Sequence, residues 1–224
     1  MNILAPSILS ADFKNLGSEI DAVAKGGAEY IHIDVMDGVF VPNISFGMPV
    51  IKSIRNATDK VFDVHLMITE PIRYIEDFKN CGADIITVHY EACSDVRAAL
   101  EKIKSSGLRA GLSVKPKTDV NVISSFLDVC DMILLMSVEP GFGGQKFIPG
   151  SLERAVRIRN MIDNSPYDID LEIDGGVTLD NLEDILSAGV NVIVAGSSIF
   201  KSPQDNTVKF MEIMENHDRK QDRN

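Results

Sequence analysis

The sequence predicts an α/β fold, a single-domain (β/α)8 TIM barrel over residues 1–224. Three observations lead to this prediction. Short apolar runs alternate with longer stretches whose apolar residues have helical spacing. There are eight such runs, and they recur roughly every 25–30 residues. A chain of 224 residues is long enough for eight strand–helix units, and this alternation implies parallel strands joined by right-handed crossovers.

The strands are predicted from short apolar runs bounded by polar residues or glycine. In chain order the runs are Ile3–Leu9, Tyr30–Val35, Val61–Met67, Ile85–His89, Ala110–Val114, Met132–Val138, Leu171–Ile173 and Val192–Ala195. No Gly-x-Gly-x-x-Gly sequence follows the first run, so the competing doubly wound fold lacks its main motif.

The helices are predicted from apolar residues three and four positions apart. These sets include Leu16/Ile20/Val23, Ile72/Ile75/Phe78, Leu100/Ile103, Val156/Ile158/Met161/Ile162 and Leu182/Ile185/Leu186. Glycine follows several of them, as at Gly82 and Gly189, and is the usual stop signal. After the last strand a short helical segment is expected at Ile199–Lys201, and the polar residues 216–224 are expected to form a frayed tail.

Composition and charge limit the partners to consider. Hydrophobic residues make up 45% and charged residues 25%, which is ordinary for a globular chain. The formal net charge is -11, so we expect neither nucleic acid nor membrane among the partners. The cysteines Cys81, Cys93 and Cys130 lie far apart, which disfavours a disulfide framework and suits a reducing compartment. Because there is no leader pattern and no apolar run of about 18 residues, a cytoplasmic protein is expected.

Polar side chains occupy one face of three predicted strands. His32 and Asp34 share a face because side chains alternate along a strand, and His65 and Asp174 hold similar positions on the third and seventh strands. If all four point into the barrel, they meet at the carboxyl ends of the strands, where such barrels carry their active sites. Two imidazoles and two carboxylates suit one divalent metal ion, such as Zn²⁺, Fe²⁺, Mn²⁺ or Co²⁺. Hydrogen bonding without a metal is the alternative for each pair taken alone.

Other polar residues on these strands have supporting roles. Asp63 and Glu172 share the faces of His65 and Asp174, so we expect them to orient the metal ligands or to serve the structure. His89 ends the fourth strand and is expected to be structural, and Asp37 opens an Asp-Gly turn.

Glycine-rich loops follow the last three strands. These loops are Gly141-Phe142-Gly143-Gly144, Gly175-Gly176 and Gly196-Ser197-Ser198. Phosphate groups in such barrels commonly bind after strands seven and eight, at a short helix N-terminus. Backbone amides of Gly176, Gly196 and Ser197 are therefore candidate phosphate donors, although turns need glycine for other reasons.

Three methionines, Met36, Met67 and Met136, lie near the upper ends of strands. They either fill the core or form an apolar wall that excludes water around a reacting carbon. A metal, two carboxylates and a phosphate site together suggest deprotonation of a carbon next to a carbonyl. One aspartate would remove the proton and the other would return it from the opposite side, which inverts the stereocentre.

The chain resembles the ribulose-phosphate 3-epimerase family along almost its whole length. The resemblance is carried by Ala5-Pro6-Ser7-Ile8-Leu9-Ser10-Ala11-Asp12-Phe13, His32-Ile33-Asp34-Val35-Met36-Asp37-Gly38, Phe40-Val41-Pro42-Asn43, His65-Leu66-Met67, Pro140-Gly141-Phe142-Gly143-Gly144-Gln145-Lys146-Phe147 and Asp174-Gly175-Gly176-Val177. In this order and combination the segments are highly specific.

The resemblance implies an epimerase that interconverts D-ribulose 5-phosphate and D-xylulose 5-phosphate in the pentose phosphate pathway. It implies that Asp34 and Asp174 are both acid/base groups and metal ligands, and that Ser7 and His65 contact the sugar phosphate. It assigns Gly141, Phe142, Gly143 and Gly144 to a flexible lid, Gly175, Gly176, Gly196 and Ser197 to the phosphate end, and Met36, Met67 and Met136 to the apolar wall. Members of the family are often dimers or hexamers, so a homo-oligomer is expected.

Two positions depart from the common family pattern. Lys117 stands where a small residue is usual, and Ser137 stands where threonine is more usual. The first departure bears on the loop after the fifth strand, and neither removes an expected catalytic group.

Two alternatives to this activity stay open and a third is disfavoured. An epimerase of a related ketose phosphate, such as allulose 6-phosphate, is one, because the sequence does not reveal sugar length. A decarboxylase of the orotidine monophosphate type is disfavoured, because Asp34-Val35-Met36-Asp37 lacks the lysine of its Asp-x-Lys-x-x-Asp motif. A non-catalytic sugar-phosphate-binding barrel would bind its ligand without proton exchange.

Overall fold

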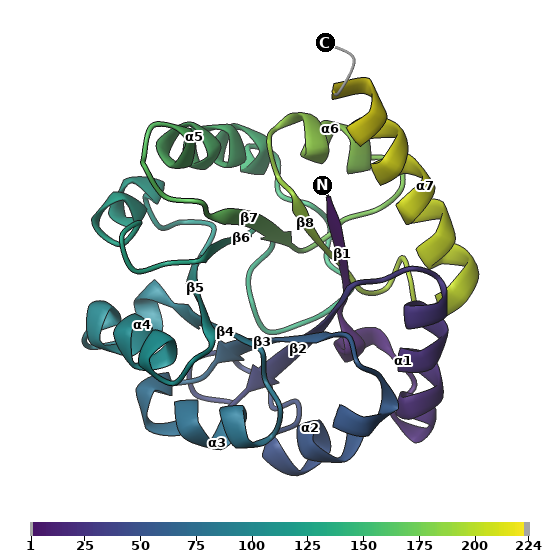
Figure 1. Ribbon diagram of the computed structural model, residues 1–224, viewed down its shortest axis with the longest axis horizontal. Helices are drawn as coiled ribbons and strands as arrows, with labels where there is room; N and C mark the ends of the chain where they lie inside the picture. The colour runs from purple at the N-terminus through teal and green to yellow at the C-terminus, as the bar shows by residue number, and fades with distance from the viewer. Residues whose placement is uncertain (1, 222–224) are drawn as a thin grey trace.

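The computed structural model describes residues 2–221, in which eight parallel strands form one ring-shaped sheet (Figure 1). The strands are β1 (Ile3–Pro6), β2 (Tyr30–Met36), β3 (Val61–Met67), β4 (Ile85–His89), β5 (Arg109–Val114), β6 (Met132–Met136), β7 (Asp170–Asp174) and β8 (Val192–Ala195). Their hydrogen-bonded order is β1-β8-β7-β6-β5-β4-β3-β2. Between β1 and β2, the Glu29 amide donates to the Leu4 carbonyl at 3.3 Å and Ser7 forms a parallel bridge with His32, so the barrel is nearly closed. The predicted single-domain (β/α)8 TIM barrel is confirmed.

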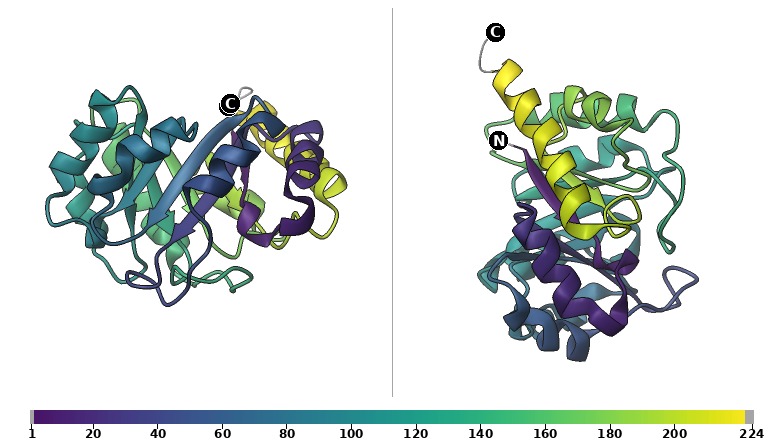
Figure 2. Two further views of the ribbon diagram at one scale, coloured as in Figure 1. Left: turned by 90° about the horizontal axis from the view of Figure 1, so that it is seen from below. Right: turned by 90° about the vertical axis from the view of Figure 1, so that its right-hand side faces the viewer.

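Helices surround this barrel, as the views from below and from the side also show (Figure 2). The α-helices are α1 (Leu16–Lys25), α2 (Met48–Ile54), α3 (Ile75–Asn80), α4 (Val96–Ser105), α5 (Ser151–Asp163), α6 (Leu182–Ser187) and α7 (Pro203–Gln221). Short 3-10 helices are η1 (Ile8–Ser10), η2 (Phe13–Asn15), η3 (Arg55–Ala57), η4 (Pro71–Tyr74), η5 (Tyr90–Ala92) and η6 (Val120–Ser125). Between β5 and β6 the crossover is made by η6 alone. No helix within residues 2–221 is both long and apolar enough to cross a membrane.

The alternation of side chains along the strands separates two cores. On β2, Ile31 and Ile33 belong to the large core between the sheet and the helices, whereas His32 and Asp34 are buried on the opposite face, inside the barrel. The first residues of several strands form a separate apolar cluster that includes Tyr30, Ile85, Met132 and Val192. This cluster closes the amino-terminal end of the barrel, so the polar interior lies above it, toward the carboxyl ends of the strands.

Two strands end earlier than predicted. β1 ends at Pro6 because Ser7 caps η1, and the Ser7 hydroxyl accepts a hydrogen bond from the Leu9 amide at 3.4 Å. β6 ends at Met136, because the Ser137 carbonyl accepts a hydrogen bond from the Ile148 amide at 2.9 Å and the chain leaves the sheet.

The carboxyl-terminal segment differs from the prediction in two ways. The expected helix at Ile199–Lys201 is wrong, because these residues form turns before α7 begins at Pro203. Proline has no amide proton and disfavours helical geometry in the residue before it, so a helix cannot run through this junction. The expected frayed tail is helical as far as Gln221, and residues 222–224 lie outside the described residues. His217 on α7 is partly buried.

Candidate functional site

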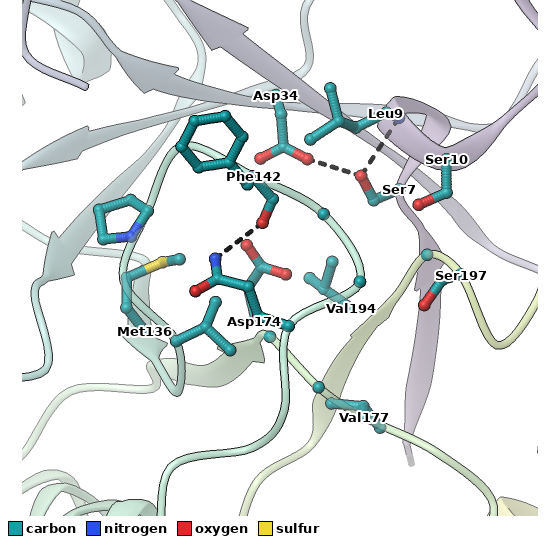
Figure 3. A pocket seen from close by; sticks show the side chains of 18 of the residues that line it. Ser7, Leu9, Ser10, Asp34, Met136, Phe142, Asp174, Val177, Val194 and Ser197 are labelled. Atoms are coloured by element: carbon teal, nitrogen blue, oxygen red, sulfur yellow. Dashed lines mark hydrogen bonds between the residues drawn. The ribbon is translucent and has the colours of Figure 1, made fainter. Parts of the chain in front are cut away.

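A cavity of about 370 Å³ opens at the carboxyl ends of the strands (Figure 3). It is lined by these residues singled out from the sequence: Ser7, Asp34, Met36, Met67, Met136, Gly141, Phe142, Gly143, Gly144, Asp174, Gly175, Gly176, Gly196 and Ser197. The fold therefore brings together at one end of the barrel residues that lie up to 190 positions apart, from Ser7 to Ser197.

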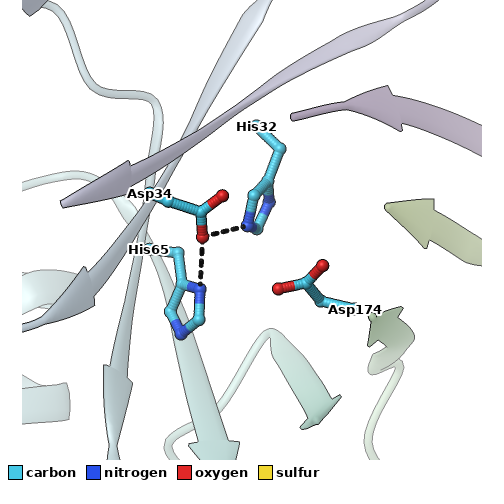
Figure 4. A group of neighbouring side chains, drawn as sticks. All are labelled: His32, Asp34, His65 and Asp174. Atoms are coloured by element: carbon cyan, nitrogen blue, oxygen red, sulfur yellow. Dashed lines mark hydrogen bonds and ion pairs between the residues drawn. The ribbon is translucent and has the colours of Figure 1, made fainter. Parts of the chain in front are cut away.

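His32, Asp34, His65 and Asp174 form a compact cluster (Figure 4). Asp34 and Asp174 line the cavity, whereas His32 and His65 are fully buried and do not line it. Each of the four residues offers one ligand atom, and these four atoms all lie within 4.8 Å of one another. The His32 Nε2 atom is 3.3 Å from Asp34 Oδ1, and the His65 Nδ1 atom is 3.1 Å from the same oxygen.

The parallel register of the sheet creates this cluster. Asp34 on β2 pairs with His65 on β3, and His32 lies two residues earlier on the same face of β2. β7 lies across the barrel from β2 (Figure 1), and its last residue, Asp174, points to the cluster (Figure 4). Side chains alternate between the two faces of a strand, and this alternation, which predicts the inward-facing residues from the sequence, places them in the cluster.

The donor set fits a divalent metal ion. His32 Nε2 is buried, and its contact with Asp34 Oδ1 at 3.3 Å lacks hydrogen-bond geometry, so it makes no hydrogen bond among residues 2–221. Such an orphan is costly unless another ligand occupies it. Two imidazole nitrogens and two carboxylates are a common set for Zn²⁺ and for other divalent ions of the first transition row.

The two aspartates of the cluster differ in proton affinity. Burial raises the pKa of Asp174 to about 6, and the negative charge of Asp34 adds to the shift. Burial also acts to raise the pKa of Asp34, but the charges and hydrogen bonds of His32 and His65 outweigh it and hold this pKa well below its usual range. Two carboxylates in one cavity with separated proton affinities are typical of acid/base pairs.

Below the cluster lies a second buried polar group. The Asp63 carboxylate is 2.6 Å from His32 Nδ1, and one Glu172 oxygen is 3.5 Å from the same nitrogen. Burial and the charge of Asp63 raise the pKa of Glu172 well above its ordinary value, whereas His32 lowers the pKa of Asp63 against the effect of burial. The expectation that Asp63 and Glu172 support the cluster is consistent with these contacts.

The loop that follows β6 covers one side of the cavity. Its Gly141 carbonyl accepts a hydrogen bond from the Asn43 side chain at 2.9 Å, and the Phe142 side chain is 55% exposed. The Gln145 amide donates to the carbonyls of Glu139 and Phe142, at 2.7 and 2.8 Å. The loop is thus held at a few points rather than packed into the core.

Sequence reasoning missed several residues of this cavity. Lys146 lines it and is the one cationic residue among the described lining residues, although it stands in a motif used for the resemblance. Ser10 also lines the cavity, and Asn181 donates a hydrogen bond to the Gly176 carbonyl at 3.0 Å. Asn43 does not line the cavity but holds the loop after β6, and nothing in its spacing indicates that it contacts a loop 98 residues away.

The two departures from the family pattern leave the cavity intact. The Ser137 hydroxyl donates to the carbonyls of Asp174 and Gly175, at 2.9 and 2.7 Å. A threonine hydroxyl at this position could make the same hydrogen bonds. The Lys117 side chain is 92% exposed and its Nζ atom is 3.8 Å from a Glu139 oxygen. Lys117 is not among the residues that line the cavity.

The turn after β7 gives a test of the cavity wall. Gly176 has a φ of +66°, and a Cβ atom there would collide with the backbone of Phe147. Gly144 has a φ of +71°, but a Cβ atom there would meet open space. Both substitutions by alanine strain the backbone, and only Gly176→Ala adds a collision, so we expect it to cost about 1–3 kcal/mol more in the free energy of unfolding. Urea unfolding of the two variants measures this difference, and equal costs would contradict it.

Two solved structures share the fold. KGPDC from Streptococcus mutans superposes with a TM-score of 0.72 at 15% identity, over 96% of this chain and 98% of that chain. A thiamine phosphate pyrophosphorylase from Pyrococcus furiosus superposes with a TM-score of 0.66 at 19% identity, over 96% of each chain. At such identities the likeness concerns the fold alone.

Sequence comparison identifies the family. Residues 3–200 match the model of the ribulose-phosphate 3 epimerase family. A ribulose-phosphate 3-epimerase from Synechocystis sp. is 50% identical over 203 residues, which cover 90% of this chain and 88% of that protein. One from Bacillus subtilis is 49% identical over 198 residues, which cover 88% of this chain and 91% of that protein. With matches of this length to both the family model and its members, the chain belongs to the ribulose-phosphate 3-epimerase family.

Proposed function

We propose that this protein interconverts D-ribulose 5-phosphate and D-xylulose 5-phosphate by moving a proton at C3, as a step of the pentose phosphate pathway. The observation that carries the proposal is the placement of Asp34 and Asp174 in one cavity, on strands from opposite sides of the barrel (Figures 1 and 3). Epimerisation at C3 needs an acid/base group on each side of the reacting carbon. One aspartate removes the C3 proton, and the other delivers a proton to the opposite face.

His32, Asp34, His65 and Asp174 would hold one divalent ion, with Zn²⁺, Fe²⁺, Mn²⁺ and Co²⁺ all suited to these ligands. When bound, the ion supplies positive charge that stabilises the negative charge developing on the substrate oxygens. The Ser7 hydroxyl donates to Asp34 Oδ2 at 2.6 Å and so orients this carboxylate beside the substrate.

Other cavity residues bind the rest of the substrate. Backbone amides around Gly176, Gly196 and Ser197 receive the phosphate, and no helix N-terminus is needed for this role. Met36, Met67 and Met136 form an apolar wall that keeps water from the reacting carbon. The loop of Gly141, Phe142, Gly143 and Gly144 closes over the sugar, with Gly175 in the facing turn.

Solvent exchange tests the proposal directly. We expect proton NMR in D₂O to show deuterium entering C3 of both epimers when the protein is incubated with D-ribulose 5-phosphate. Exchange should be lost after treatment with a chelator and restored by a divalent ion. Failure of the metal-loaded protein to exchange the proton would contradict the epimerase, and faster turnover of allulose 6-phosphate would contradict the pentose substrate. Exchange that survives complete metal removal would contradict only the role of the ion.

The assembly and location of the protein stay predictions. We propose a homo-oligomer in the cytoplasm, supported by the family resemblance and by the free thiols of Cys81, Cys93 and Cys130.

A further inference from the structure

A chain of polar contacts leads away from the metal cluster through His65. One ring nitrogen of His65, Nδ1, faces Asp34 within the cluster, and the other, Nε2, points away from it (Figure 4). His65 Nε2 lies 2.9 Å from Nε2 of His89, the last residue of β4. His89 Nδ1 in turn lies 3.3 Å from Oε2 of Glu91. The two imidazoles are fully buried.

The contact between two imidazoles allows only one direction of hydrogen bonding for a metal-binding His65. A ligand nitrogen must offer its lone pair, so Nδ1 of His65 carries no proton and the proton lies on Nε2. This N–H donates to Nε2 of His89, which must then carry its own proton on Nδ1. The His89 Nδ1–H group donates to the Glu91 carboxylate, which can only accept.

We propose that His89 and Glu91 are positioning residues that fix the tautomer and the ring orientation of His65 as a metal ligand. Metal-binding histidines usually donate their second nitrogen to a carboxylate or a carbonyl. In this chain a second imidazole lies between the ligand and the carboxylate. The inference rests on the proposed metal site, and it gives His89 a role beyond the structural one expected from the sequence.

The carboxylate at the end of this chain is itself held in place. Glu91 Oε1 accepts a hydrogen bond from the Lys115 backbone amide at 2.9 Å and another from the Thr118 hydroxyl. The Phe40 ring packs on His89 with 4.9 Å between ring centroids, and Lys115 Nζ lies 3.8 Å from the centre of the Phe40 ring. The loop after β5 therefore holds Glu91 in place and helps to enclose His89. Through these two residues it affects the position of His65.

The other histidine of the cluster provides an internal comparison. The outer nitrogen of His32 contacts the Asp63 carboxylate directly, at 2.6 Å. The two metal-binding histidines therefore depend on different outer partners, and changes at Glu91 should affect His65 without altering the partner of His32.

Metal affinity and imidazole tautomers test the inference without an activity assay. The variants are Glu91→Gln, which keeps the size of the side chain but adds an amide donor, and His89→Leu, which removes the acceptor. We expect each to weaken Zn²⁺ binding about 10- to 100-fold in competition with a chromophoric chelator. Glu101→Gln is the control, because it removes the same charge from exposed α4, where Glu101 lies 4.0 Å from Arg97.

Nitrogen NMR of histidine-labelled, Zn²⁺-loaded protein reads the tautomers, since the chain has only four histidines. We expect the proton on Nε2 of His65 and on Nδ1 of His89 in the wild type, and a changed His65 signal in Glu91→Gln. The opposite tautomers, or unchanged affinity in Glu91→Gln, would overturn the inference even if His89→Leu fails to fold. A wild type that binds no divalent ion would overturn the proposed metal site as well, so the two failures are distinguishable.

Discussion

Replacing either Asp34 or Asp174 by asparagine is expected to lower the rate of epimerisation by roughly 10²- to 10⁴-fold, the usual contribution of a general acid or base. Asparagine has the shape of aspartate but cannot accept the proton. Because each variant keeps one carboxylate, it should still exchange the C3 proton of the one epimer whose hydrogen faces that carboxylate. The two variants should therefore exchange opposite epimers.

Proton NMR in D₂O, begun separately from each epimer, measures both effects. Circular dichroism and thermal unfolding of the variants provide the control for folding, and metal content is measured alongside. If either variant retained full epimerisation, the assignment of two acid/base groups would be wrong. If both variants exchanged the same epimer, the two carboxylates would not lie on opposite sides of C3.

A large effect on stability is expected in the polar interior below the cluster. Asp63 and Glu172 are both fully buried beside His32, yet their pKa values shift in opposite directions. Asp63→Asn removes the negative charge that faces His32 and leaves a buried amide group beside it. We expect this variant to lose about 3 kcal/mol in the free energy of unfolding, as for other broken buried pairs.

Glu172→Gln is the matched comparison. Burial and the charge of Asp63 favour the neutral form of Glu172, and glutamine reproduces that neutrality at a similar size. We therefore expect a cost below about 1 kcal/mol. Urea unfolding of both variants, each with and without chelator, measures the difference. Equal costs would mean that Glu172 is ionised like Asp63.

Much of this site follows from simple rules applied to the sequence. Alternation of side chains along β2 predicts that His32 and Asp34 face the barrel interior, and the parallel register then places Asp34 next to His65. The carboxyl ends of all strands meet at one end of a (β/α)8 barrel, so the glycine loops after β6, β7 and β8 had to meet there too. These predictions rest on periodicity and topology, which depend little on side-chain detail.

The remaining features depend on contacts that no local pattern encodes. The sequence does not indicate that His89 Nε2 lies within hydrogen-bond distance of His65, because two adjacent strands can pair in several registers. It also does not reveal the hydrogen bond between Asn43 and the loop after β6. The wrong prediction of a helix at Ile199–Lys201 has a local cause. The apolar pair Ile199 and Phe200 suggests the start of a helix, but Pro203 prevents a helix from running through this segment.

The unequal pairing of β1 with its two neighbours, β8 and β2, has a consequence for the synthesis of the protein. β1 pairs along four residues with β8. Toward β2 it has only a hydrogen bond from the Glu29 amide to the Leu4 carbonyl at 3.3 Å among the described residues and, just past its end, the bridge between Ser7 and His32. The extended backbone pairing of β1 in the sheet therefore depends on β8, the strand farthest from it in the sequence. Ser7 follows β1 directly, and its hydroxyl donates to Asp34 on the neighbouring strand β2. A chain that ended before β8 would therefore lack both the main backbone partner of β1 and two lining residues of the cavity, Gly196 and Ser197.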